Sequence, residues 1–173
     1  MAIVECEVPV ASVLDRQLVD AAYFRDAYRA HMCRPNATVV EIFFAVFSHH
    51  PAWIKWALRI RNRIASACGL DAPTADEIMN QQMRPAYEVG DKIGPWPIFA
   101  LSPNELVAGR NNKHLDFRLS VLREPHGAAA STVISTICTV HNVYGKIYLF
   151  FIVPFHKWGV KQLIARAIAS GRL

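Results

Sequence analysis

Apolar and polar positions follow different periods along the chain, and each period predicts an element. Residues 23–32 alternate between apolar and polar, which is typical of a strand with one buried face. Thr38 and Glu41 then form a capping-box pattern, in which each side chain satisfies a backbone N–H left open at a helix start. We therefore expect a short helix that ends near Phe47 and follows the first strand.

A second helix is predicted after Pro51, because proline suits the first turn of a helix and disfavours helical backbone at the preceding residue. It should end at Gly69, a residue that commonly adopts the left-handed conformation after a helix. Its apolar positions recur every three or four residues on one face: Trp53, Ala57, Ile60, Ile64 and Cys68. A basic row on another face, interpreted as solvated, consists of Lys55, Arg59 and Arg63.

From Tyr87 onward the pattern is that of antiparallel strands joined by turns. After a short helical turn near residues 76–81, strands are predicted over 93–101, 105–109, 114–123 and 130–141. The clearest alternation places Leu115, Phe117, Leu119 and Val121 on one face of the third of these. The last shows little alternation, which indicates burial on much of both faces.

The C-terminal segment opens with an apolar run, Ile147 to Phe155, that periodicity alone does not assign to strand or helix. A cap at Asn142 and a periodic column beyond Pro154 favour one long helix over residues 144–170, kinked at the proline. That column consists of Phe155, Trp158, Gln162, Ala165 and Ala169. The run is about half of the roughly 20 residues that a membrane span requires, so we expect it to pack inside the domain.

Together these elements predict a single α+β domain over residues 1–173. A curved antiparallel sheet would surround the long C-terminal helix, with two short helices after the first strand. A chain of 173 residues fits one domain. It is 53% hydrophobic and 19% charged, richer in apolar residues than a typical soluble domain, so we expect part of this excess to line a cavity.

Two motifs resemble those of a family of bacterial proteins of unknown function. Residues 49–70 carry the pattern P-x-W…L-x-x-R-N, with Arg61 and Asn62 at its end. Residues 140–168 carry H-x-x-x-G-x-x-Y…P-F-H, which begins at His141. The element order also resembles the helix-grip fold, the START, Bet v 1-like or SRPBCC type. This resemblance implies a cavity between sheet and long helix, where relatives hold lipids, polyketides, hormones or other apolar small molecules, and it brings no activity with it.

The candidate ligand-binding residues combine polar groups with aromatic walls, which is the usual composition of a small-molecule site. His141 ends the last strand and Tyr148 begins the helix, so both could reach one ligand atom, and His156 is a third polar candidate. Arg61 could bind a carboxylate or phosphate, although a bond to backbone carbonyls is the preferred interpretation. The expected aromatic walls are Trp96, Phe99, Phe117, Phe151 and Trp158.

The sequence lacks the motifs that usually mark metal binding, phosphate binding or a catalytic nucleophile. The histidines have no spacing typical of a metal site, and the four cysteines form no C-x-x-C pair. No phosphate-binding loop or nucleophile elbow occurs, so we expect neither a metal nor a cofactor. Residues 1–20 carry acidic side chains and lack the features of a signal peptide, and we expect a cytoplasmic protein.

Three functions stay open. The first is binding of an apolar or amphipathic small molecule without chemistry. The second is a cofactor-free cyclase, hydratase or isomerase that uses His141 and Tyr148, with Asp26, Tyr28 and Asp116 also available as acid/base groups. The third and weakest is docking of the basic helix face on an acidic partner or on nucleic acid, which a net charge of +5 permits but does not select. A homodimer is compatible with all three.

Overall fold

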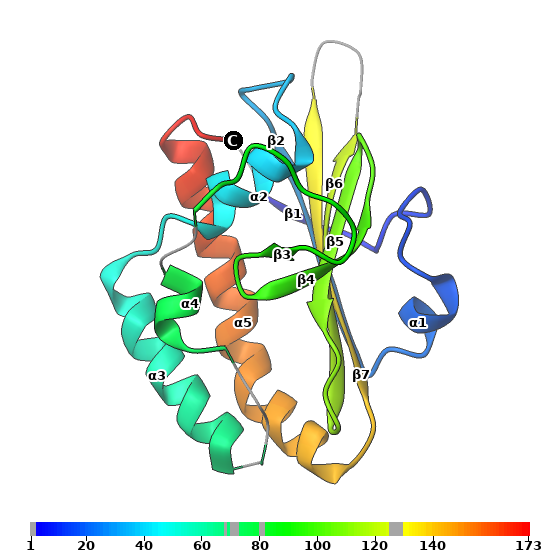
Figure 1. Cartoon of the computed structure of the whole chain (residues 1–173), viewed down its shortest axis with the longest axis vertical. Coiled ribbons are helices and arrows are strands. Elements are labelled where there is room, and N and C mark those ends of the chain that lie inside the picture. Colours follow the sequence, from blue (N-terminus) through cyan, green and yellow to red (C-terminus); the bar gives the residue numbers. More distant parts are fainter. Residues whose placement is uncertain (1–2, 68, 70–72, 80–81, 125–129) are drawn as a thin grey trace.

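The computed structural model describes residues 3–67, 69, 73–79, 82–124 and 130–173, except the side chains of Ala52, Lys55 and Ala75. The fold is of the α+β class, as predicted. Figure 1 shows α2, α3, α4 and α5 on one face of a sheet, and the N-terminal segment with α1 on the other. In chain order the elements are β1 (Val4–Glu5), α1 (Arg16–Asp20), β2 (Phe24–His31), α2 (Val39–Phe47), α3 (Ala52–Ala67), α4 (Ala75–Met79), β3 (Lys92–Ile93), β4 (Trp96–Leu101), β5 (Glu105–Arg110), β6 (Leu115–Glu124), β7 (Ser131–Val140) and α5 (Val143–Ala169).

In the described part of the chain the strands form one antiparallel sheet of seven, in the order β1-β2-β7-β6-β5-β4-β3. β7 pairs along its whole length with β6 and over residues 131–138 with β2. Residues 131–138 are all buried, which confirms the burial predicted from their lack of alternation. β7 is enclosed because helices cover one face of the sheet and the N-terminal segment covers the other.

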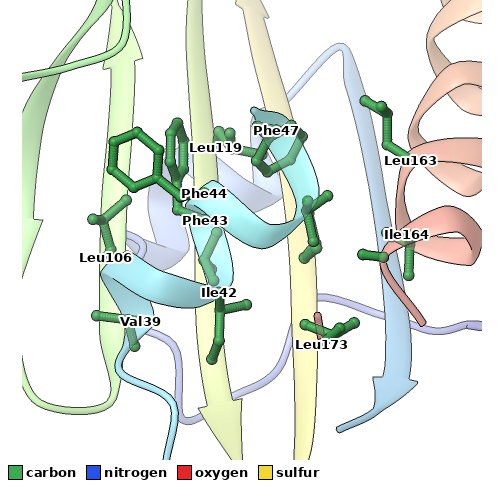
Figure 2. Close-up of a cluster of buried hydrophobic side chains, with 14 of the residues drawn as sticks. Val39, Ile42, Phe43, Phe44, Phe47, Leu106, Leu119, Leu163, Ile164 and Leu173 are labelled. Atoms are coloured by element: carbon green, nitrogen blue, oxygen red, sulfur yellow. The ribbon is translucent and has the colours of Figure 1, made fainter. Parts of the chain in front are cut away.

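The larger core lies between the sheet and the helices α2 and α5. Figure 2 shows Phe43 and Phe47 of α2 beside Leu119 of β6, with Ile164 of α5 at the other side of the cluster. Thr38 forms the capping box predicted for α2, since Glu41 N donates to its hydroxyl and Thr38 N donates to the Glu41 carboxylate. The helix is nearly all buried because it fills the space between sheet and α5.

A second, smaller core lies on the opposite face, where the N-terminal segment and α1 pack. Its buried residues are Val8, Leu14, Val19, Ala27, Val107, Leu122, Val133 and Ile137. A buried carboxylate, Glu105, attaches this segment to the sheet. It accepts hydrogen bonds from Ser12 Oγ at 2.5 Å, Val13 N at 2.6 Å and Ser120 Oγ at 2.5 Å.

The long C-terminal helix exists as predicted, but its apolar run is not wholly packed inside the domain as expected. Asn142 caps it by accepting from two backbone N–H groups, and Pro154 lies within it. The column from Phe155 to Ala169 is exposed, whereas the buried positions are Gly145, Leu149, Val160, Leu163, Ile164 and Ala167. Ile147, Phe150 and Phe151 are also exposed, so the apolar run is only partly inside the domain. A run without polar residues does not indicate which side of the helix faces the sheet.

One further expectation needs correction. The strand predicted over residues 93–101 is a hairpin, because Gly94 has a φ of +57° and turns the chain between β3 and β4. β1 and β3 have two residues each and are too short to show a period. Cys68, expected at the end of α3, lies outside the described residues. Among the described helices, none is both long enough and apolar enough to cross a membrane.

Candidate functional site

A cavity of about 460 Å³ lies between the sheet and the two helices α3 and α5. From the sheet, Phe24, Leu115, Phe117, Leu119 and Cys138 contribute to its wall. From α3 come Trp53, Ala57, Ile60 and Ile64, and from α5 come Tyr148, Leu149, Ile152, Val153 and Val160. The three- and four-residue spacing in both helices gives each one a continuous apolar face toward the cavity.

The cavity opens to solvent between α3 and α5. Three of its lining residues, Trp56, Phe155 and Trp158, are also exposed. Beside this opening the rings of Trp53 and Trp158 touch, with centroids 4.3 Å apart. The two helices therefore form both the wall and the rim of the cavity.

One end of the cavity carries polar side chains, and Arg61 is central to it. Arg61 Nε and Nη2 donate to Asn62 Oδ1 at 3.1 and 2.9 Å, and Nη2 also donates to the carbonyl oxygen of Pro73 at 2.9 Å. These partners are neutral, and in the described part of the chain Nη1 has no hydrogen-bond acceptor. The backbone hydrogen bond expected for Arg61 is therefore present, and no described residue accepts a hydrogen bond from Nη1.

Arg110, Asn112 and Tyr148 line the same end of the cavity. Burial lowers the pKa of Arg61, Tyr148 opposes this effect, and the charge of Arg110 adds to it. An arginine nevertheless stays protonated in proteins, so this end is positively charged. No Asp or Glu is among the described residues that line the cavity. The other end, near α2, is lined mainly by apolar side chains, among them Phe47, Ile54, Val160 and Leu163, and His50 also lines the cavity.

A second polar group enters the wall at His156. Its Nε2 lies 3.4 Å from each carboxylate oxygen of Asp26, which is almost fully buried. Tyr28 Oη donates to Asp26 Oδ2 at 3.0 Å. Burial raises the pKa of Tyr28, and the neighbouring Asp26 charge raises it further, so Tyr28 is a neutral donor. The buried carboxylate thus orients a histidine ring that lines the cavity.

The structure places six of the nine candidate site residues at the cavity: Arg61, Trp96, Phe117, Tyr148, His156 and Trp158. His141, Phe99 and Phe151 do not line it. His141 is exposed, with Nε2 3.2 Å from Asp116 Oδ1, and the Arg118 guanidinium covers the Phe99 ring at 3.7 Å. Thr136 and Cys138 of β7 line the cavity, so alternation along the strand turns the odd-numbered His141 away from it. Phe151 lies on the outer side of α5.

Sequence reasoning missed several lining residues. Trp53, Ile60 and Ile64 were assigned to one apolar face of a helix but were not named as candidate site residues. Phe24 and Cys138 face the cavity because neighbouring strands place them opposite each other in the sheet. Of the basic row on α3, Arg59 and Arg63 are exposed as expected, and the side chain of Lys55 lies outside the described residues.

The described residues contain no group of three or more His, Cys, Asp and Glu side chains that could hold a metal ion. The predicted acid/base pair of His141 and Tyr148 is not brought together at the cavity, because only Tyr148 lines it. The titratable groups that do meet there are His156 and, behind it, Asp26.

Comparison with known proteins identifies a family but no activity. The model of a family described as a protein of unknown function, DUF2867, matches residues 18–163. The solution NMR structure of a protein from Arthrobacter aurescens is similar to this chain, with 15% sequence identity and a TM-score of 0.43. The match covers 95% of this chain and 96% of that protein. That likeness is too weak to support an argument about function. No curated protein matches significantly. Because the family match spans most of the chain, the protein belongs to the DUF2867 family of unknown function, and the matched range includes all the lining residues.

Proposed function

We propose that this protein binds an amphipathic small molecule in the cavity between the sheet, α3 and α5. The observation that carries the proposal is a cavity of about 460 Å³ with apolar walls and a few polar groups at one end. Pockets for small molecules usually enclose about 300–1,000 Å³ and have this composition. The proposal also takes the fold to be of the helix-grip type and the protein to be cytoplasmic.

The polar end gives the bound molecule a direction. Arg61 offers Nη1 to a ligand, and Arg110 adds positive charge beside it. An anionic head group, such as a carboxylate or phosphate, would form a charge-assisted hydrogen bond there. The apolar part would then extend past Trp53 and Phe117 toward Val160. Burial of that part would supply most of the binding free energy.

Native mass spectrometry of freshly purified protein tests the proposal. We expect an added mass that organic solvent removes, because a molecule buried in this cavity dissociates slowly. The variant Ala57→Phe places a large ring in the cavity and should lose the added mass. The control Ala169→Phe makes the same change at an exposed position of α5 and should keep it. Equal ligand content in both variants would contradict binding in the cavity.

A second candidate function is favoured by the pair of His156 and Asp26. A buried carboxylate that orients a histidine at a cavity wall is an arrangement used in general acid–base catalysis. The protein would then be a cofactor-free isomerase, hydratase or cyclase. Incubation of the extracted ligand with the protein in D2O should give a changed mass or product, and His156→Gln should stop this while binding persists. Recovery of the ligand unchanged by the parent protein would exclude this candidate.

A further inference from the structure

The outer side of α5 exposes a stripe of large apolar side chains. It consists of Tyr144, Ile147, Phe150, Phe151, Phe155 and Trp158, and we call it the outer stripe. Phe150 is 76% exposed, more than most aromatic side chains of a folded protein. The residues recur every three or four positions, so they form one continuous surface over the first half of the helix. Apolar patches of this kind usually mark an interaction surface.

The outer stripe continues onto α3 at the opening of the cavity. Trp56 of α3 is 65% exposed, and it lines the cavity together with Phe155 and Trp158 of the stripe. Whatever covers the stripe therefore also meets the opening. This continuity connects the surface with the cavity, but the surface itself does not depend on a bound ligand.

Positive charge is concentrated on the same two helices. α3 and α5 carry eight of the 19 Lys and Arg residues of the chain and none of its 14 Asp and Glu residues. The rest of the chain then has 11 basic and 14 acidic residues, a net charge of −3. Lys157 and Lys161 at one flank of α5 each pair with Glu5, at 3.2 and 3.0 Å. Arg59 and Arg63 on α3 are exposed, as is Lys146 on α5.

We propose that the outer stripe and the exposed face of α3 dock the protein on an anionic membrane surface. An amphipathic helix with aromatic residues on one side and lysines or arginines beside them lies in the plane of such an interface. Tyr and Trp are well suited to the boundary between headgroups and hydrocarbon. In this orientation the cavity opens toward the lipid. The proposal goes beyond ligand binding, because docking needs only the surface.

Charge argues against a second copy of the chain as the partner. In a two-fold dimer the same patch meets itself, so α3 and α5 of one subunit would face the same basic helices of the other. Neither helix has an acidic residue that could offset this repulsion. Nucleic acid would accept the charge, but its backbone offers little to the aliphatic and aromatic side chains of α5. An anionic bilayer matches both the charge and the apolar area.

Vesicle co-flotation at two salt concentrations tests the proposal. We expect the protein to float with vesicles of phosphatidylcholine mixed with phosphatidylglycerol, and much less with phosphatidylcholine alone. High salt should weaken the binding, because salt screens the attraction between the exposed cations and the anionic surface. Brominated lipids should quench tryptophan fluorescence of the parent protein, since Trp56 and Trp158 lie on the docking side. This fluorescence measurement needs only the parent protein.

Two double variants separate the apolar and the basic contributions. Ile147→Gln with Phe150→Gln should reduce vesicle affinity about tenfold or more by removing apolar area at exposed positions outside the cavity lining. Arg59→Gln with Arg63→Gln should reduce it about tenfold on anionic vesicles only. Val10→Gln removes an apolar side chain of the N-terminal segment that is even more exposed than Phe150, and it should change nothing. Thermal unfolding confirms that each variant folds.

Three outcomes would overturn the proposal. The first is no flotation and no quenching with anionic vesicles. The second is a concentration-dependent dimer that Ile147→Gln with Phe150→Gln abolishes, which would identify a second copy as the occupant. The third is equal retention on DNA and on vesicles with no loss in that variant. Ala57→Phe, the cavity-filling variant, should still float, so failure of ligand binding and failure of docking are distinguishable.

Discussion

At the scale of single residues, side-chain direction decided which candidates reach the cavity. His141 was a reasonable candidate from its position between β7 and α5, but β7 shows no alternation of polarity from which its two faces could be distinguished. Cys138 and Thr136 line the cavity. Because successive side chains of a strand point to opposite faces of the sheet, His141 then lies on the face away from the cavity. Arg61 was identified by its motif, and its neutral partners became known only from the folded chain.

Cys138 provides a test of cavity burial at this scale. Burial raises the pKa of its thiol from 9.0 to about 12, and the Asp26 charge adds to the shift. Cys33 is exposed. A disulfide reagent applied at about pH 8 should therefore modify Cys33 and spare Cys138, because the thiolate is the reactive form. Peptide mapping by mass spectrometry would locate the label. Rapid modification of Cys138 in the folded protein would contradict its enclosure.

The same shift predicts a pH dependence of stability. The folded state holds the Cys138 proton at a pH where the unfolded chain has released it. This contribution to the free energy of unfolding is complete below about pH 9 and is lost as the pH rises toward about 12. The free energy of unfolding, measured with urea, should therefore fall less steeply with pH in Cys138→Ala than in the parent protein over this range. The two slopes should differ by at most about 1.4 kcal/mol per pH unit.

At the level of helices and strands, the sequence predicted those elements that are marked by a helix cap or by regular alternation. The capping box of α2, the cap at Asn142 and the alternation of β6 each depend on neighbouring residues and were readable from the sequence. The buried side of α5 was not readable, because its first half is apolar all round and only the sheet selects a face. The hairpin at Gly94 was also missed, since two-residue strands carry no pattern.

The start of α5 provides the test at this scale. A Cβ at Gly145 would collide with the His114 carbonyl oxygen and meet Val140 Cγ1 at 3.0 Å, so Gly145→Ala should lower stability by about 1–3 kcal/mol. Gly159 lies in the same helix, and a Cβ there would meet Trp53 at an ordinary 3.8 Å. Gly159→Ala should be neutral or stabilise by about 0.5–1 kcal/mol, because alanine favours the helix. Thermal unfolding of both variants distinguishes the effects. Equal stability of the two would show that α5 does not approach β6 and β7 this closely.

At the scale of the whole molecule, the fold separates two chemical surfaces. The N-terminal segment covers one face of the sheet, where Glu105 attaches it. On the other face, α3 and α5 stand away from the sheet far enough to enclose a cavity. The high apolar content of the sequence indicated such a space. Its volume, its opening and its charged end depend on how the helices pack, which no sequence period specifies.

The most direct test of the central claim is a fluorescence titration with 1-anilinonaphthalene-8-sulfonate, an apolar anion. We expect saturable binding at one site by the parent protein and by Ala169→Phe, and at least about tenfold weaker binding by Ala57→Phe because its ring fills the cavity. Thermal unfolding of all three proteins establishes that they are folded. Equal affinity in the parent and Ala57→Phe would place the dye outside the cavity and contradict the account.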